Sequence, residues 1–327
     1  MSFPQHRMRR LRRTPPLRRL VSETAISIDD LVAPLFVREG ISTPQVIVPL
    51  PGQLQHTVAS LVTEAKRLCA LGVPALLLFG VPRAKDGRGS GASDPDGIAQ
   101  VALSELRSAL GDEMVLIADL CLDEYTDHGH CGVLDSKGDV DNDATLERYG
   151  EVAVAQAEAG ASVVAPSGMM DGQVRAIREA LDGASFIDVA MLAYSAKQAS
   201  ALYGPFRSAV NVTIAGGGDR RSYQQDPANR LEALAEIDLD VAEGADMVMV
   251  KPAITNLDVI REARERVSVP IGAYQVSGEY SMIKAAAAAG WLDGGAVALE
   301  QLTAIKRAGA TFIVSYLAAE IAQVIGG

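Results

Sequence analysis

The sequence predicts an α/β fold, a (β/α)8 TIM barrel with an N-terminal arm, from three observations. Short apolar runs rich in Val, Ile and Leu alternate with helical stretches about eight times along the 327 residues. These runs are apolar on both faces, as expected for parallel strands that are covered on both sides. No Pro/Ser-rich linker or low-complexity tract divides the chain, so one large domain is favoured, with a doubly wound sheet as the weaker alternative.

Four of the predicted strands follow a glycine that ends the preceding helix. The sequences are CALGVPALLLFG, AEAGASVVAPS, AEGADMVMVKP and RAGATFIVSYL, with Gly72, Gly160, Gly244 and Gly309 at the helix end, where a positive φ is expected. The other four strands are predicted at LVAPLFV (31–37), VLIADL (115–120), DVAMLAY (188–194) and PIGAYQV (270–276). Helices are predicted over 57–71, 97–110, 144–159, 229–243, 256–267, 279–289 and 296–308.

The N-terminal segment differs in charge from the rest of the chain. Its first 20 residues contain seven arginines and no acidic residue, and these seven positive charges leave −18 on the remainder of a chain whose net charge is −11. We therefore expect residues 1–25 to form an extended arm for subunit contact and residues 26–327 to form the catalytic barrel. Nucleic-acid binding by the arm is the alternative, but it is disfavoured by the acidic body and the lack of interleaved aromatic residues.

Composition also bears on the location of the protein. No stretch reaches 18 consecutive apolar residues, and no apolar run follows the N-terminal arginines, so neither a membrane span nor a secretory signal is expected. The chain has three cysteines, an odd and small number for a disulfide framework. These features favour a reducing cytoplasm.

Two lysines, Lys197 and Lys251, follow neighbouring predicted strands and indicate carbonyl chemistry. A lysine amine attacks a ketone only when it is neutral, and a second ammonium about 6 Å away lowers its pKa by roughly two at an effective dielectric of about 20. Neighbouring strands of a barrel direct their C-terminal ends into one cavity, so each lysine can activate the other. The alternative is that both extend from strand ends into solvent.

The segment DLCLDEYTDHGHCG (119–132) predicts a metal site. Alternation along the strand puts Cys121 and Asp123 on one face, and the glycine-containing loop can bring Cys131 back toward them. Three ligands with an open position are typical of a catalytic zinc. His128 and His130 could be ligands themselves or could orient the ligands, and we expect the second. The oxygen ligand makes the site more tolerant of magnesium, so zinc is only narrowly preferred. Two unlinked buried cysteines are the alternative.

The segment 203–227 is longer than an ordinary connection between a strand and a helix and contains three consecutive glycines, 216–218. Such loops commonly act as lids over a barrel's active site. Arg207, Arg220 and Arg221 suit a carboxylate or phosphate, and Gln224 can add an amide contact. A small anionic substrate is therefore expected, unless these arginines simply lie in solvent.

Taken together, the motifs YSAK, YGPFR, GDRR with YQ, MVKP, YQVSGEY, PSGMMDG and DHGHCG resemble the porphobilinogen synthase, or 5-aminolevulinate dehydratase, family. The resemblance is collinear over nearly the whole chain. It implies a (β/α)8 barrel whose arm wraps a partner, usually in a homo-octamer. It also implies condensation of two 5-aminolevulinate molecules to porphobilinogen, with loss of two waters, in tetrapyrrole (haem) biosynthesis.

The resemblance also implies roles for individual residues. Lys197 and Lys251 match the two Schiff-base lysines. The carboxylate-binding positions are matched by Arg207, Arg220 and Gln224 for one substrate and by Ser277 and Tyr316 for the other. Asp119, expected to be catalytic, and Ser167 match polar groups of the same cavity, and Glu236 matches a position that binds an activating magnesium ion near a subunit interface.

The chain departs from the family pattern at two places. Zinc-dependent members resemble C-x-C followed by a third cysteine and other members use aspartates, whereas this chain combines Cys121, Asp123 and Cys131. The glycines at 216–218 alter the lid spacing, so Arg220 rather than Arg221 is a reasoned choice. A class I aldolase-type barrel with one lysine is the nearest rival function, and a nucleic-acid-binding barrel without catalysis is a rival from another class.

Overall fold

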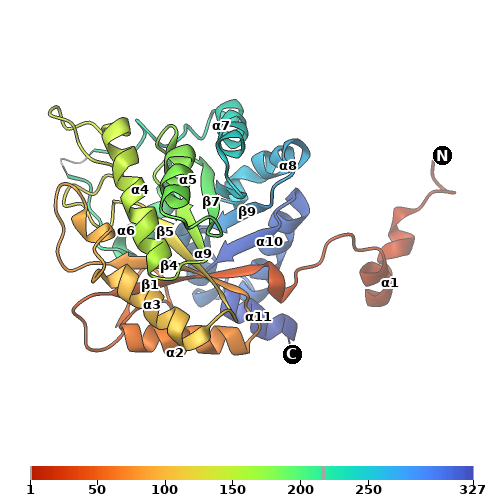
Figure 1. The fold of residues 1–327 in the computed structure, drawn as a ribbon. Helices are drawn as coiled ribbons and strands as arrows, with labels where there is room; N and C mark the ends of the chain where they lie inside the picture. Colours follow the sequence, from red (N-terminus) through yellow and green to blue (C-terminus); the bar gives the residue numbers. More distant parts are fainter. Residues whose placement is uncertain (1, 216–217, 327) are drawn as a thin grey trace.

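The computed structural model describes residues 2–215 and 218–326, and its centre is a closed parallel barrel (Figure 1). The strands follow one another in chain order around the barrel, and β10 pairs with β1 to close it. The barrel strands are β1 (Leu31–Arg38), β4 (Ala75–Val81), β5 (Val115–Leu120), β6 (Val163–Pro166), β7 (Ala190–Lys197), β8 (Met247–Lys251), β9 (Ile271–Gln275) and β10 (Phe312–Ser315). The predicted (β/α)8 barrel is therefore confirmed.

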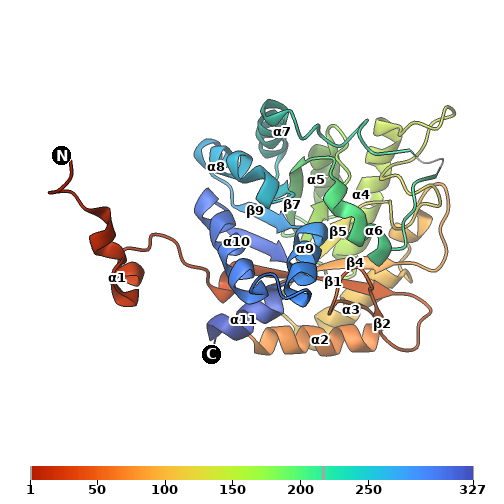
Figure 2. The same ribbon diagram turned by 180° about the vertical axis from the view of Figure 1, so that it is seen from behind.

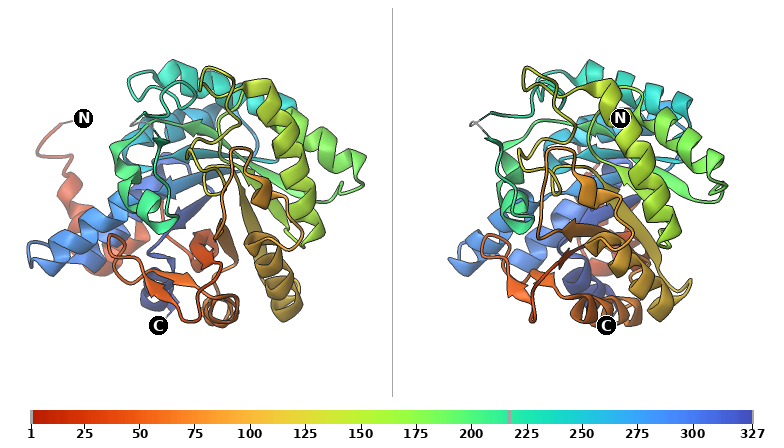
Figure 3. Two further views of the ribbon diagram at one scale, coloured as in Figure 1. Left: turned by 90° about the vertical axis from the view of Figure 1, so that its left-hand side faces the viewer. Right: turned by 60° about the vertical axis from the view of Figure 1, so that its left-hand side comes forward.

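Helices surround the barrel on its outside, as Figure 3 shows. They are α2 (Val58–Ala70), α3 (Ile98–Leu110), α4 (Asn142–Glu158), α5 (Gln173–Gly183), α7 (Arg230–Glu243), α8 (Leu257–Arg266), α9 (Ser277–Ala288), α10 (Gly294–Ala308) and α11 (Ala318–Gly326), while α6 (Gly204–Ala209) lies in the segment 203–227. The seven predicted helices are present with ends shifted by at most two residues. The sequence analysis did not identify α5, α6 or α11. Strands such as β1 and β4 are buried along nearly their whole length, as the runs apolar on both faces predict.

The glycines predicted at helix ends adopt the expected backbone conformation. Gly72, Gly160, Gly244 and Gly309 have φ values of 82°, 100°, 108° and 130°. A residue with a Cβ atom rarely adopts such values, so glycine is favoured where the chain turns from the helix toward the next strand.

Strand β7 is longer than predicted, and this changes the position of the first lysine. The pairing of β7 with β8 shifts register between Ala193 and Ala196, and the two strands then continue to a Lys197–Lys251 pair. Both lysines are therefore the last residues of their strands, not residues beyond the strand ends. The irregularity of the ladder keeps β7 paired after the shift and places the two lysines opposite each other.

The N-terminal segment lies away from the barrel, at the end opposite to the loops that follow the strands (Figures 1 and 2). It contains a 3-10 helix, Met8–Arg12, and α1 (Pro15–Leu20), and neither has a buried residue. Two short strands, β2 (Gln45–Val46) and β3 (Leu54–His56), form an antiparallel pair, and β3 also pairs with β1. Within the described residues, no helix combines the length and apolarity needed to cross a membrane.

Candidate active site

A cavity at the C-terminal ends of the strands is lined by residues from several of the predicted sites. Its walls come from β4, β5, β7, β8, the residue after β6, and the lid segment 203–227. It is lined by Phe79, Asp119, Asp123, Glu124, Ser167, Lys197, Tyr203, Phe206, Arg207, Arg220, Gln224 and Lys251. The fold thus brings both lysines, the predicted Asp119 and Ser167, and three predicted carboxylate-binding residues to one place.

Lys197 and Lys251 approach the same aromatic ring from adjacent strands. Their Nζ atoms lie 5.7 Å and 5.1 Å from the centre of the Tyr194 ring. Tyr274 also faces Lys251, at 4.6 Å from its Nζ. Both lysines are about 5% exposed. The alternative that these side chains extend into solvent is therefore wrong, because the barrel buries the strand ends beneath the lid.

The two lysines have different surroundings. Lys197 Nζ donates a hydrogen bond to the Ser167 carbonyl oxygen. Burial, and after it the positive charge of Lys197, lower the pKa of Lys251 to about 7 against the opposing effect of nearby carboxylates. Repulsion between the amines, the cause expected from the sequence, is the smaller effect, and burial among aromatic rings is the larger one. The Lys251 amine is thus neutral at ordinary pH for a large fraction of the time, and only a neutral amine can attack a carbonyl.

Asp119, in β5, lines the same cavity as the two lysines. Its Oδ2 accepts a hydrogen bond from Ser167 Oγ at 3.1 Å. Burial raises the pKa of Asp119 to about 6, although both lysines oppose this increase. A carboxyl group with a pKa near neutrality can both accept and return a proton, which suits general acid–base catalysis.

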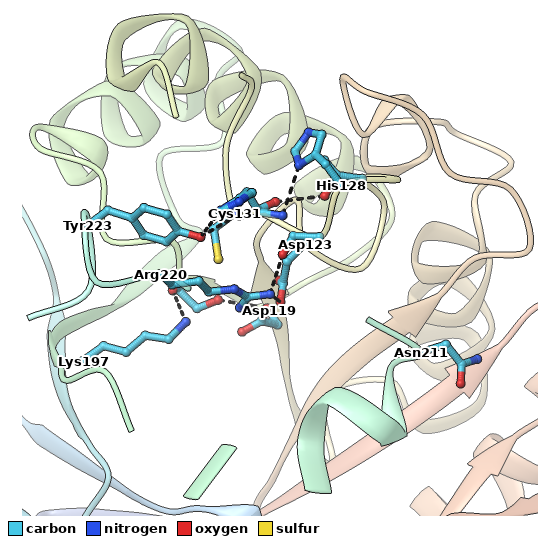
Figure 4. A network of polar contacts seen from close by, with 12 residues as sticks. Asp119, Asp123, His128, Cys131, Lys197, Asn211, Arg220 and Tyr223 are labelled. Atoms are coloured by element: carbon cyan, nitrogen blue, oxygen red, sulfur yellow. Dashed lines mark hydrogen bonds and ion pairs between the residues drawn. The ribbon is translucent and has the colours of Figure 1, made fainter. Parts of the chain in front are cut away.

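The lid supplies cationic and amide groups to the cavity. Arg220 forms an ion pair with Asp123 across 2.8 Å, and its Nη2 also donates to the Gly129 carbonyl at 2.7 Å (Figure 4). Arg220 Nε and Gln224 Nε2 are buried without a hydrogen-bond partner among the described residues. Buried donors without partners cost free energy, so these groups are suited to an anionic ligand that enters the cavity. Arg221, by contrast, is largely exposed.

Ser277 and Tyr316 lie next to this cavity rather than in its lining. Ser277 Oγ donates to the Leu202 carbonyl and accepts a hydrogen bond from the Phe206 amide. Tyr316 forms a 3.1 Å hydroxyl contact with Tyr274, whose ring faces Lys251. Their predicted role in holding the second carboxylate stays a prediction.

The predicted metal ligands come together in the fold. The candidate ligand atoms of Cys121, Asp123 and Cys131 all lie within 4.8 Å of one another, and all three residues are buried. Two sulfur ligands about 2.3 Å from one ion fit such separations, so the donor set suits a thiolate-binding divalent metal. A hydrogen bond from Cys121 lowers the pKa of Cys131 to about 7, which favours a thiolate ligand. Arg220 already contacts one oxygen of Asp123, so the carboxylate would be shared.

The two histidines of the same segment lie outside the ligand group. His128 Nδ1 accepts a hydrogen bond from the His130 amide, and His130 Nδ1 contacts the Tyr223 hydroxyl at 3.1 Å. Neither belongs to the cluster of candidate ligands found among the described residues. Their expected role of orienting the ligands stays a prediction.

Glu236 lies in α7 and faces a separate hollow. This hollow also contains Glu232, Asp171 and Asn142, and residues 221–226 of the lid form one of its walls. Burial and these neighbouring acidic groups raise the pKa of Glu236. A bound divalent cation would offset the repulsion among these carboxylates. Of the lid glycines 216–218, Gly216 and Gly217 lie outside the described residues.

Several residues in or beside the cavity were not identified from the sequence. Tyr194 and Tyr274 lie in strands, where their side-chain direction was not evident, and Glu124 follows the better-marked Asp123. Tyr203 and Phe206 were inside the recognised YGPFR motif and could have been included. Tyr203 also donates a hydrogen bond to the Gln198 carbonyl at 2.7 Å, which fixes its ring beside Lys251.

Comparison with known proteins agrees with this geometry. Residues 5–324 match the family model described as delta-aminolevulinic acid dehydratase. The chain is 58% identical over 323 residues to the delta-aminolevulinic acid dehydratase of Mycobacterium tuberculosis H37Rv, covering 98% of each chain. It is 56% identical over 326 residues to that of Streptomyces coelicolor, covering 99% of this chain and 98% of the relative. Its fold matches the crystal structure of the delta-aminolevulinic acid dehydratase of Toxoplasma gondii ME49 in complex with the reaction product porphobilinogen, with a TM-score of 0.96. The two sequences are 41% identical, and the match covers 98% of this chain and 91% of that chain.

Proposed function

The chain belongs to the delta-aminolevulinic acid dehydratase family, and from this membership we propose how its residues divide the reaction among them. It is a lyase that condenses two molecules of 5-aminolevulinate to porphobilinogen, with loss of two waters, in tetrapyrrole biosynthesis. The division of roles is our proposal. It is supported most by one observation, which is that the two buried amine nitrogens lie within 6 Å of the centre of one ring, Tyr194.

Each lysine captures one substrate through its ketone. The neutral Lys251 amine attacks the carbonyl carbon, and loss of one water leaves a positively charged imine on the enzyme. This imine withdraws electrons, so the adjacent carbon loses a proton more easily and the imine carbon accepts a nucleophile. Lys197 activates the second substrate in the same way. Holding both substrates in one cavity removes much of the entropic cost of bringing two molecules together.

The remaining cavity residues orient the substrates and move protons. Arg207, Arg220 and Gln224 bind one substrate carboxylate, and the donors of Arg220 and Gln224 without partners in the described structure support this role. Ser277 and Tyr316 bind the other carboxylate after a small rearrangement. Asp119, with a pKa of about 6, exchanges protons with the carbons and amines that react.

Cys121, Asp123 and Cys131 would hold a catalytic divalent ion, and zinc is narrowly preferred for this sulfur-rich set. Such an ion acts as a Lewis acid when bound. A second ion, magnesium, is proposed at Glu236, where burial and then neighbouring carboxylates raise the pKa of the glutamate. Metal analysis of protein purified without chelator, followed by activity after each ion is added back, tests both assignments.

We also propose a homo-oligomer, with an octamer as the expected size, in the cytoplasm. Residues 1–25 form the arm in this proposal, and residues 26–327 form the catalytic barrel. The exposed arginines of the arm and the acidic body of the chain support contact between subunits rather than nucleic-acid binding.

Borohydride reduction in the presence of 5-aminolevulinate tests the lysine assignment. Reduction traps an imine as a stable amine, and peptide mapping should locate the adduct on Lys251, with a second adduct on Lys197 at saturating substrate. Lys251→Met should abolish porphobilinogen formation, whereas Lys137→Met, at an exposed loop position, should leave it unchanged. Substantial turnover by Lys251→Met would favour the class I aldolase-type alternative instead.

A further inference from the structure

The lid rests on the segment that contains the candidate metal ligands. The Ala215 amide donates a hydrogen bond to the His128 carbonyl at 3.0 Å, and Arg220 Nη2 donates to the Gly129 carbonyl at 2.7 Å. Two separate parts of the lid therefore contact the backbone just before Cys131. These contacts hold the lid against this segment as well as over the lysines.

The fit between the two segments is close at Gly129. This residue has a φ of 73°, and a Cβ atom added there would lie 2.5 Å from the Thr213 carbonyl oxygen of the lid. A side chain of any size would push the lid backbone away. Glycine is thus required here by both the local conformation and the approach of the lid.

Tyr223 connects the lid directly to Cys131. The Cys131 amide donates a hydrogen bond to the Tyr223 hydroxyl oxygen at 3.3 Å (Figure 4). The same hydroxyl lies 3.1 Å from His130 Nδ1. Because its oxygen accepts from the Cys131 amide, the hydroxyl can donate its proton to His130. On the other side, Tyr149 donates to the Cys131 carbonyl at 2.7 Å. Two tyrosine hydroxyls, one of them from the lid, therefore hold the backbone of Cys131.

A second candidate ligand also contacts the lid. Asp123 forms its 2.8 Å ion pair with Arg220, and both side chains are at most 7% exposed. Thus two of the three candidate ligand residues, Asp123 and Cys131, are held by lid side chains. The third, Cys121, follows the end of β5 and is fixed by the barrel. Opening the lid would remove one support from each of the two loop ligands.

We propose that Tyr223 is a positioning residue for the metal centre, and that through Tyr223 and Arg220 the closed lid and a metal bound at Cys121, Asp123 and Cys131 stabilise each other. This inference rests on the metal site proposed above. Groups that orient metal ligands typically change metal affinity by about 10- to 100-fold when they are removed. Coupling between two sites is reciprocal, so the factor by which closure strengthens metal binding equals the factor by which metal favours closure.

Cobalt(II) binding provides the first test, because cobalt bound to thiolates absorbs light by charge transfer and reports the site itself. Metal-free parent protein and Tyr223→Phe are titrated with Co²⁺, and the variant should bind about tenfold more weakly. Tyr280→Phe is the matched control, because it also removes a tyrosine hydrogen bond, but one made to the Pro51 carbonyl and not to a candidate metal ligand. Its cobalt affinity should equal that of the parent.

Trypsin cleavage after Arg221 provides the second test, because this arginine lies in the lid and its side chain is 81% exposed. The fragment ending at Arg221 is followed by mass spectrometry with and without Co²⁺. Cobalt should slow this cleavage in the parent, and Tyr223→Phe should be cleaved faster and protected less. Gly129→Ala disturbs the contact between the lid and the ligand segment from the side of the ligand segment, so it should also weaken cobalt binding. This second variant keeps the test decisive if Tyr223→Phe folds poorly.

The proposal is overturned if Tyr223→Phe and Gly129→Ala bind cobalt as tightly as the parent. It is overturned equally if cobalt leaves lid cleavage unchanged, or if the parent shows no thiolate absorption with cobalt. Porphobilinogen formation by the metal-free parent is measured alongside. If the cobalt tests fail while the protein still forms porphobilinogen, the lysine chemistry stands and the metal-linked lid fails, so the two proposals are tested separately.

Discussion

Replacing Lys197 by methionine should make Lys251 a poorer nucleophile at neutral pH. Lys251 has a pKa of about 7 because it is buried and because it faces the positive charge of Lys197. Methionine removes this charge and keeps a side chain of similar length. The ammonium form of Lys251 then becomes easier to maintain, so its pKa rises and its neutral fraction at pH 7 falls.

The structure sets the size of this effect. Nitrogens that lie 5.7 Å and 5.1 Å from the centre of the same ring can be no more than about 11 Å apart. At separations of roughly 6 to 11 Å and an effective dielectric of about 20, the repulsion is about 1.5–2.8 kcal/mol, or one to two in pKa. The neutral fraction of Lys251 at pH 7 then falls from about one half to between one tenth and one hundredth.

Borohydride trapping across a pH series measures the consequence. Imine formation at Lys251 with 5-aminolevulinate should be about 5- to 50-fold slower in Lys197→Met than in the parent at pH 7, because only the neutral amine reacts. The difference should shrink as the pH rises above the new pKa of Lys251, where both proteins carry a neutral amine. The Lys137→Met variant should follow the parent curve.

A midpoint for Lys251 that stays near pH 7, or moves to lower pH, in Lys197→Met would refute the reasoning. In that case burial alone would account for the low pKa of Lys251, and the argument that the amines activate each other would be wrong. A uniform loss of trapping at every pH would instead indicate a change in substrate binding, and the midpoint distinguishes the two.

Three further predictions concern the ion pair, the barrel and the arm. Asp123→Ala leaves the Arg220 guanidinium buried without its carboxylate, so urea unfolding should show a loss of about 3–5 kcal/mol, and a normal midpoint would contradict this. Gly278→Ala places a Cβ atom 2.6 Å from the Leu202 carbonyl oxygen; we expect a destabilisation of about 1–3 kcal/mol by thermal unfolding, and an unchanged Tm would show that the backbone adjusts freely. Deleting residues 1–20 should lower the oligomer mass in light scattering, and an unaltered mass would reject the arm as a subunit contact.

Much of the fold followed from local patterns. The alternation of helices and apolar runs predicted all eight barrel strands, because a parallel strand covered on both faces must be apolar on both faces. Gly72, Gly160, Gly244 and Gly309 marked helix ends because only glycine readily adopts their φ values. Helix α6 was not predicted, because it lies in a loop whose residues pack against α9 and whose own pattern is too short to show a period.

For the site, residue types and motifs identified which groups do the chemistry, since Lys197, Lys251 and the Cys121–Asp123–Cys131 set are recognisable from their neighbours along the chain. Their arrangement in space was a different matter. The pairing of Arg220 with Asp123, the contact of Tyr223 with Cys131 and the convergence of both lysines on Tyr194 join residues from 3 to nearly 100 positions apart. Such contacts depend on how the barrel closes and on where the lid packs, which together bury these side chains. Burial changes pKa values through desolvation, and no local sequence pattern contains that information.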